Sequence, residues 1–395
     1  MRVRFGELSA QEALEKERLR VGARAAWQCV RAGDDAKASA LVEALDPRLV
    51  FSLRRDPDER VACAELAAFE PSAWPLAELL LAQAPADLDC ILSLGRMAVP
   101  LERALAEVRA SHQVELEHAS LRAGFGRGHL LELTLGVPGG AGSENEQNAA
   151  ENLARALLGD RVFETWVGAV HVTPAPRAGS LRVLDPHAPR TTLKLSELCA
   201  TVSAAVLGVL QGLPEWSRAQ AARIASDNRA HGGSVFDADA RGEWTLLETE
   251  PLDDRSGSRK DDLVLASTCT PELLRCYLDG SPCASRRFSR TGERFVFVSY
   301  EDDERTMQGR VKRRTAIEAA LSAVVADVGA VTGVGFGVKT SYIDLALCNL
   351  ETGLTRLVSK LRDLDAPARS FIQFFDSELA DEWLSIWPDS RLTEG

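Results

Sequence analysis

Apolar and polar positions along this chain follow two periods, one typical of α-helices and one typical of β-strands. Helical spacing covers residues 9–32 and 36–45, and Ser9 with Glu12 fits the capping pattern of a helix start. The positions that we expect on the buried face of the first helix are Leu14, Val21, Ala25 and Val30. The sequence therefore predicts a helical N-terminal segment over residues 1–47.

Runs typical of strands begin at residue 48 and alternate with helical stretches. Strands are predicted over residues 49–53, 60–66, 88–94, 130–137, 166–173 and 181–184. Helices are predicted over residues 74–84, 101–110, 149–158 and 195–210, and the polar stretch 139–148 is expected to be a loop. Sheets of this kind bury one face beneath helices.

The final third repeats this order of elements. Strands are predicted over residues 295–300, 331–338, 342–347 and 370–375, and helices over 312–328, 351–364 and 377–387. In the last helix Leu379, Trp383 and Trp387 would share a face, with Asp376 as its cap. Strand, polar loop, helix, strand, strand and helix follow one another in both thirds, which predicts an internal duplication.

The predicted fold class is α+β, with two or three antiparallel-sheet modules, helices on one face and a split β-α-β or ferredoxin-like plan. Residues 48–228 would form the first module or modules and residues 243–395 the second. The stretch 229–242 between them carries Gly, Asp and His without apolar periodicity, so we expect a linker or exposed loop.

Composition is that of a globular chain, with 395 residues, 45% hydrophobic and 26% charged, at a net charge of −12. An acidic surface repels phosphate backbones and attracts basic proteins, so a basic protein partner is favoured over nucleic acid. No apolar run reaches the length of a membrane span, and residues 198–213 are expected to form a buried helix. Eight scattered cysteines are typical of a reducing compartment, which predicts a cytoplasmic protein.

Two glycine runs bear on possible binding sites. Gly124, Gly126 and Gly128 precede a predicted strand instead of a helix, which favours a bend over a dinucleotide site. Gly333, Gly335 and Gly337 share one face of a strand, where close packing within the molecule is favoured over a ligand groove. The sequence predicts no cofactor.

Residues with catalytic chemistry are present without a catalytic motif. Cys269, Cys276 and Cys283 recur every seven residues and lack the close cysteine spacing of zinc sites, so no metal is predicted. The alternative of an enzyme with a site at the junction of the two modules would use His129, His171 and Cys269.

Acidic side chains are the candidate binding residues, namely Asp237, Asp239, Glu301, Asp302, Asp303 and Glu304. In its Ala and Arg usage the chain resembles intracellular α+β proteins of high-GC bacteria, some of which are immunity partners of toxins. The sequence therefore favours a non-enzymatic binding protein, with an immunity-type inhibitor of a basic protein as the concrete version. A structural or assembly component, associating through the N-terminal helix, is a further alternative.

Overall fold

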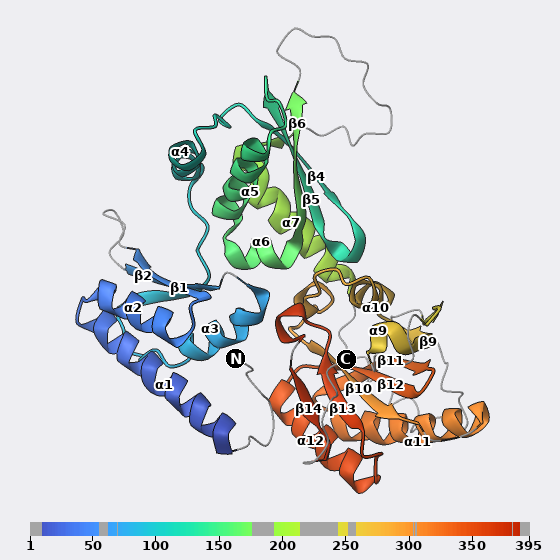
Figure 1. Ribbon diagram of the computed structural model, residues 1–395. Helices are drawn as coiled ribbons and strands as arrows, with labels where there is room; N and C mark the ends of the chain where they lie inside the picture. The colour runs from blue at the N-terminus through green and yellow to red at the C-terminus, as the bar shows by residue number, and fades with distance from the viewer. Residues whose placement is uncertain are drawn as a thin grey trace, which may run out of the picture. The chain divides into compact units, whose positions relative to one another are not determined.

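The computed structural model describes residues 10–54, 62–68, 70–175, 193–213, 244–251, 258–302, 304, 306–380 and 382–387. The chain divides into an amino-terminal unit, Leu14–Val209, and a carboxy-terminal unit from Leu210 onward. Helices and strands occur in both, so the predicted α+β class is confirmed (Figure 1). The predicted strand 181–184 and the predicted linker 229–242 lie outside the described residues.

The amino-terminal unit begins with two helices packed on a small sheet. Helices α1 (Ala10–Arg31) and α2 (Asp35–Leu45) precede strands β1 (Leu49–Arg54), β2 (Ala62–Ala68) and β3 (Cys90–Leu94), and α3 (Trp74–Leu81) connects β2 to β3. Strand β1 is antiparallel to β2, but β3 is parallel to β2 because the α3 crossover returns the chain to the same end.

The buried face of α1 differs from the predicted one. Leu14 and Val21 are 74% and 56% exposed, and the buried residues are Leu19, Ala23, Ala26, Trp27 and Val30. Trp27 fixes the rotation of the helix, since its indole donates a 2.9 Å hydrogen bond to the Leu80 carbonyl and meets the Phe51 ring edge-on. Of the four predicted positions, Val30 is buried and Ala25 is half-buried, whereas Leu14 and Val21 are exposed.

A second sheet of the same unit has the order β6-β5-β4-β7. Its strands are β4 (Ser120–Phe125), β5 (Leu131–Pro138), β6 (Val167–Ala175) and β7 (Leu193–Lys194), with helices α4 (Leu101–His112), α5 (Glu144–Leu158) and α6 (Asp160–Trp166). Helix α5 begins within the predicted loop 139–148, because Ser143 and Glu146 form a reciprocal capping box. The first glycine run forms the β4–β5 turn, where Gly128 has a φ of 61°, so a structural role is confirmed.

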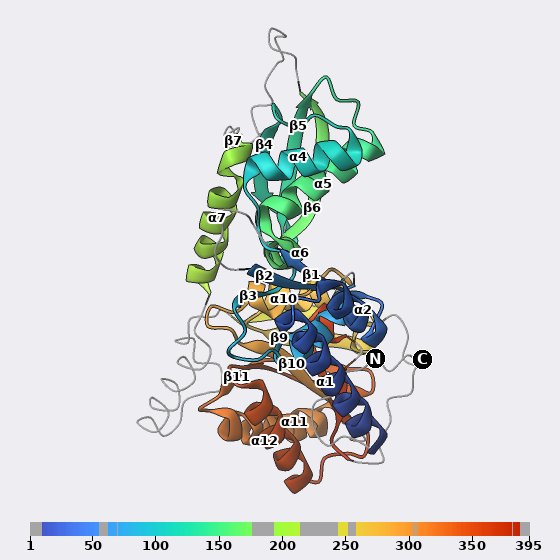
Figure 2. The same cartoon turned by 90° about the vertical axis from the view of Figure 1, so that its left-hand side faces the viewer.

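Helix α7 (Leu198–Gly212) is present as predicted, but it is not the buried helix that its composition suggests. Only Leu198 and Val202 are buried along it, and Leu207 is 54% exposed. Figure 2 shows α7 to one side of α4 and α5, and its first turn contacts α5, because the Cys199 thiol donates to the Leu157 carbonyl at 2.9 Å. In the described part of the chain, Leu195–Gly212 is the one stretch whose length and composition would suffice to cross a membrane, with 17% of it buried.

The carboxy-terminal unit contains a seven-stranded sheet with the order β14-β13-β10-β12-β11-β9-β8. The strands are β8 (Thr245–Glu248), β9 (Leu263–Thr268), β10 (Arg294–Glu301), β11 (Gly329–Gly337), β12 (Thr340–Leu347), β13 (Ser370–Phe374) and β14 (Trp383–Ser385). All neighbouring strands are antiparallel. With α11 (Met307–Val325) after β10 and α12 (Leu350–Asp363) after β12, the central four strands have the ferredoxin-like order, which confirms that prediction.

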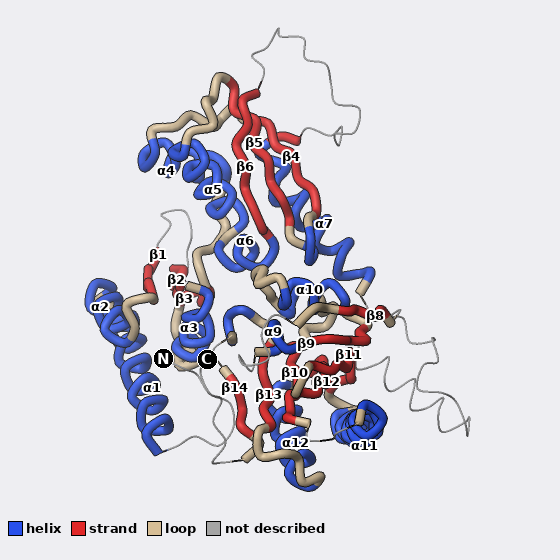
Figure 3. Tube along the Cα trace, turned by 45° about the vertical axis from the view of Figure 1, so that its right-hand side comes forward, coloured by secondary structure: helices blue, strands red, loops and turns tan. Residues whose placement is uncertain are grey.

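Helices cover both faces of this sheet, whereas one covered face was predicted. Val296, Val298 and Tyr300 join a core with α11 and α12, and Phe295 and Phe297 join a second core beneath α10 (Pro271–Leu278). Figure 3 shows α11 and α12 on one side of the sheet and the short helix α9 (Arg259–Asp262) with α10 on the other. The unbroken apolar run of β10 fits this arrangement, because a strand buried on both faces loses its polar alternation.

The internal duplication is not confirmed. Strands β5 and β6 of the middle third are parallel neighbours joined by α5 and α6. Strands β10 and β11 of the final third are separated by β12, which is antiparallel to each of them. The linear order of elements agrees in the two thirds, but the strand order in space differs.

The predicted helix 377–387 is wrong. One short helical turn, Ser377–Leu379, is followed by β14, which pairs with β13 at the edge of the sheet. Asp376 makes no capping hydrogen bond, and its carboxylate accepts from the Ser285 amide at 2.7 Å. The Trp383 and Trp387 spacing that suggested a helix face also fits a strand, in which residues two and four positions apart share a side.

Replacing Ser143 with Ala should lower the unfolding free energy of the amino-terminal unit by about 1 kcal/mol, because the α5 capping box is lost. Thermal and urea unfolding followed by circular dichroism would measure the change. Ser203→Ala, at an exposed position within α7, is the control and should cause no loss. Equal destabilisation by both substitutions would contradict the assigned role of the capping box.

Candidate functional site

The predicted acidic loop lies at the end of β10, and its side chains have different surroundings. Glu301 is about half exposed, with its carboxylate 3.7 Å from the Arg369 guanidinium. The Asp302 carboxylate is fully buried, accepts a 2.9 Å hydrogen bond from the Ser341 hydroxyl and lies 3.4 Å from Arg310. Glu304 is exposed. Asp303, Asp237 and Asp239 lie outside the described residues, so the structure brings together Glu301, Asp302 and Glu304.

Asp302 belongs to a set of side chains that hold the turn between β11 and β12. The Arg310 guanidinium donates to the carbonyls of Gly337 and Thr340, both at 3.1 Å, and to that of Val338 at 3.3 Å. On the strand side, Asp262 accepts from the backbone amides of Lys339 and Thr340 at 3.1 and 3.3 Å. Side chains therefore hydrogen-bond the backbone groups of this turn, and the Asp302 carboxylate is paired with Arg310 inside the fold.

A buried ion pair lies next to this turn, between Arg259 and Asp344. The two guanidinium nitrogens donate to the two carboxylate oxygens at 2.5 and 3.0 Å, and the side chains are 0% and 1% exposed. The Arg259 guanidinium also lies 4.7 to 5.4 Å from three aromatic ring centres, those of Phe297, Tyr342 and Phe375. Paired hydrogen bonds and ring faces offset the loss of water around both charges.

Helix α9 supplies residues to both features, with Arg259 at its first position and Asp262 at its last. Tyr342 lies on β12, two positions before Asp344. Its hydroxyl donates a 2.7 Å hydrogen bond to the Asp262 carboxylate. Burial and then the Asp262 charge raise the pKa of Tyr342 well above its ordinary value, so Tyr342 remains a neutral donor. We call Arg259, Asp262, Tyr342 and Asp344 the buried ionic layer.

The second glycine run makes room for this layer. A Cβ atom on Gly333 would lie 2.6 Å from an Asp344 carboxylate oxygen, and one on Gly337 would lie 1.7 Å from an Asp262 oxygen. A Cβ on Gly335 would meet Leu263 of β9 at 3.0 Å. Packing within the molecule is thus the role of all three glycines, as predicted, although carboxylates fill the space near two of them.

The residues proposed for an enzyme site lie in different parts of the chain. His171 is exposed on β6 and pairs with Thr134, whereas His129 precedes the start of β5, so the two lie at different levels of the sheet. Cys269 belongs to the carboxy-terminal unit, where its thiol donates to the Thr332 carbonyl at 3.0 Å. Within the described ranges, no three His, Cys, Asp or Glu side chains are grouped so that they could hold a metal ion.

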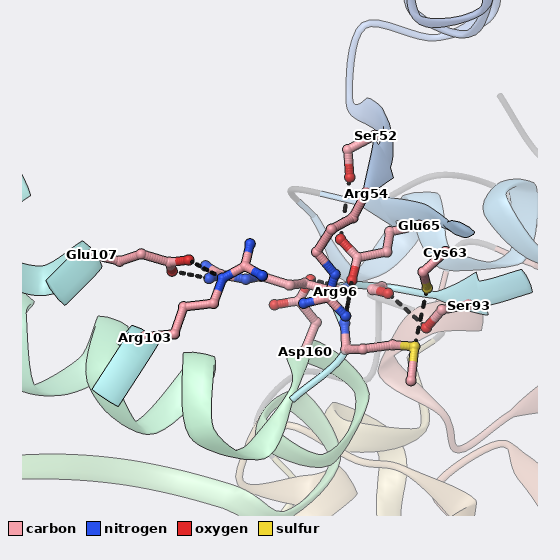
Figure 4. A network of polar contacts seen from close by, with 11 residues as sticks. Ser52, Arg54, Cys63, Glu65, Ser93, Arg96, Arg103, Glu107 and Asp160 are labelled. Atoms are coloured by element: carbon pink, nitrogen blue, oxygen red, sulfur yellow. Dashed lines mark hydrogen bonds and ion pairs between the residues drawn. The ribbon is translucent and has the colours of Figure 1, made fainter. Parts of the chain in front are cut away.

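A second polar network lies in the amino-terminal unit, around the segment that follows β3 (Figure 4). Glu65 of β2 accepts from the Met97 amide at 3.0 Å and the Ser52 hydroxyl at 3.2 Å. On the other side of this segment, Asp160 accepts from the Arg96 amide at 2.7 Å. Two carboxylates thus bind consecutive backbone amides from opposite sides, which fastens the three-stranded sheet to α6.

Both networks have the geometry of structural supports. In the buried ionic layer, Arg259, Asp262 and Asp344 are 2, 3 and 1% exposed and contact one another or nearby backbone, so a substrate cannot reach them in this conformation. In the network around Glu65, the carboxylate oxygens accept hydrogen bonds from the protein itself. Acid–base catalysis requires a titrating group within reach of a bound substrate, and these groups do not meet that requirement.

Asp344→Asn should destabilise the carboxy-terminal unit by about 3–5 kcal/mol, because Arg259 keeps a buried charge without a counter-charge. Chemical denaturation would measure the loss. The control is Glu272→Gln, which removes an exposed pair with Arg275 on α10 and should cost about 0.2–0.5 kcal/mol. Similar decreases in unfolding free energy for the two variants would show that the buried pair stabilises the unit no more than an exposed pair does.

Gly337→Ala should displace Asp262 and lower the thermal unfolding midpoint of the carboxy-terminal unit, since the new methyl group overlaps the carboxylate. Gly124→Ala is the matched control, because a Cβ at this strand position has nothing within 4 Å. Scanning calorimetry of the full chain would compare the two. An unchanged midpoint in the Gly337 variant would contradict the packing role of the glycine.

Comparison of the chain with models of protein families, with curated proteins and with solved structures found no match. The functional argument therefore depends on the residues and geometry described above.

Proposed function

We propose that this chain is a non-enzymatic binding protein that recognises a basic partner protein, with an immunity-type inhibitor as the concrete form. The observation that carries the proposal is the exposure of α7, a helix of 15 residues without a charged side chain. Along its second half Leu207 is exposed and Val206, Val209 and Leu210 are half-exposed, and apolar side chains that are grouped at a surface in this way often mark a binding site.

The composition of α7 suits the centre of a protein interface. From Ser203 to Gly212 no residue is buried, and this half of the helix contains Val206, Leu207, Val209 and Leu210. Interface centres are depleted in charge and are dominated by apolar contacts, with polar residues at the rim. A partner would therefore present an apolar patch to this half of α7.

The charge of the chain supports a basic partner. The net charge is −12, and Glu301 and Glu304 are exposed on the carboxy-terminal unit, whereas Asp302 is buried beside Arg310. Opposite charge on the partner would raise the association rate, and this contribution would weaken as salt screens it.

The proposal includes that the protein is not an enzyme. Its support is that the buried charges described above are paired within the fold. The buried charges of Arg259 and Asp344 are paired with each other. The candidates His171 and Cys269 occupy separate units. Recognition requires only a stable scaffold and a surface, and the described residues supply both.

The test uses the full chain as bait in lysate of the source organism, at low and at physiological salt, with captured proteins identified by mass spectrometry. We expect a basic protein whose capture decreases with salt. Leu207→Asp should reduce capture at least about tenfold, because a charge in an apolar interface centre costs more than 1.4 kcal/mol.

Leu14→Asp is the matched control, since it also replaces an exposed leucine on a helix of the same unit. It should leave capture and the thermal midpoint unchanged. Failure to capture any protein at low salt, or equal capture by both variants, would refute the proposal. A self-associated chain in the eluate would instead support an assembly component.

A further inference from the structure

Two of the cysteines that recur every seven residues are in contact. Cys276 lies in the last turns of α10, and Cys283 follows a four-residue loop that brings the chain back to the helix. The loop is closed by a 3.0 Å hydrogen bond from the Ser281 amide to the Cys276 carbonyl, and the Cys283 amide donates to the Ser377 hydroxyl at 2.8 Å. Both side chains belong to the core beneath α10, and the Cys283 sulfur lies 3.9 Å from the carbonyl of Leu273, three residues before Cys276 on the helix.

A buried arginine lies beside the pair. Arg287 is 0% exposed, and its guanidinium hydrogen-bonds the Cys276 sulfur as well as the Pro282 carbonyl. The Cys283 hydrogen bond and then the Arg287 charge lower the pKa of Cys276 to about 7. The shared hydrogen bond and burial raise the pKa of Cys283 well above its ordinary value. The adjacent Arg287 guanidinium therefore favours Cys276 as the thiolate of the pair, whereas the Cys283 thiol lies 3.9 Å from the Leu273 carbonyl, to which it can donate.

The pair is close to the surface although both side chains are 3% exposed. In the connecting loop Asp279, Gly280 and Pro282 are exposed. A peroxide would reach the sulfurs through local opening of this loop. A bond between the two sulfurs would close a ring of eight residues without requiring a distant segment to move.

We propose that Cys276 and Cys283 are a redox-active dithiol that a hydroperoxide oxidises to a disulfide. The Cys276 thiolate attacks the outer oxygen of hydrogen peroxide, the O–O bond breaks, and protonation of the leaving hydroxide gives water and a sulfenic acid. The Cys283 sulfur then attacks the Cys276 sulfur, the S–O bond breaks, and a second water leaves with the Cys283 proton. Both cysteines are oxidised, and one peroxide is reduced to two waters.

The contact, the adjacent cation and the short loop distinguish this pair from the other cysteines. Cys199 and Cys348 are exposed, and burial raises the pKa of Cys63 and Cys90, in the case of Cys63 in spite of the nearby Arg54 guanidinium. Oxidation would also remove the thiolate that hydrogen-bonds Arg287. The state of the pair would thereby change the surroundings of a buried charge in the core of the carboxy-terminal unit.

Peptide mapping tests the proposal on the full, unmodified chain. The reduced protein is treated with limiting hydrogen peroxide, denatured in iodoacetamide and digested with trypsin. Cleavage after Arg275 and Arg286 releases residues 276–286, which contain both cysteines and no other. We expect this peptide to appear without alkylation and lighter by two hydrogens, while Cys199 and Cys348 are still alkylated. Dithiothreitol should restore alkylation.

The rate at which residues 276–286 lose alkylation should rise with pH through about 7 and then level off, because it follows the fraction of Cys276 that is thiolate. Cys283→Ser should leave Cys276 as a sulfenic acid that dimedone labels, and Cys348→Ser should leave the disulfide yield unchanged. The proposal is overturned if residues 276–286 stay fully alkylated after Cys348 has reacted, or if they reach only sulfinic acid. These readouts on the unmodified chain remain decisive if the Cys283 variant does not fold.

Discussion

The carboxy-terminal unit depends on an ion pair that has no access to water. Removing two charges from solvent is costly, and their attraction compensates only when the geometry is close to ideal and the remaining polar atoms are satisfied. Arg259 and Asp344 meet the first condition with two parallel hydrogen bonds, and three aromatic rings surround the guanidinium. Three elements thus each contribute one aromatic ring to the surroundings of a single cation, namely Phe297 on β10, Tyr342 on β12 and Phe375 after β13.

This pair also connects the added strands to the ferredoxin-like core. Arg259 begins α9, which leads directly into β9, whereas Asp344 lies on β12, a central strand of the core. Asp262, at the other end of the same helical turn, binds the β11–β12 turn. One turn of helix thus adds side-chain contacts to the backbone hydrogen bonds that set the register of β9 against β11.

Sequence patterns predicted much of this fold because the signals are local. The apolar runs of β10 and β12 and the helical period of α12 are sufficient to place those elements and the ferredoxin-like order. The partners of individual side chains were not predictable, since Arg259 and Asp344 are 85 residues apart. The exposure of α7 was also missed, because an apolar helix has the same composition whether its own fold or another molecule covers it. The acidic residues of the loop after β10 were evident from the sequence, but the burial of the Asp302 side chain was not.

The contact between Gly337 and Asp262 restricts how this protein can change over generations. A side chain at position 337 and a carboxylate at position 262 would occupy the same space, so neither position can vary freely while the other is kept. A Cβ at position 337 would also lie 2.7 Å from the backbone oxygen of Asp262, so a shorter residue at 262 would not by itself make room for it. The backbone as well as the carboxylate that anchors the β11–β12 turn therefore requires glycine at 337, and this glycine should persist among descendants of the chain.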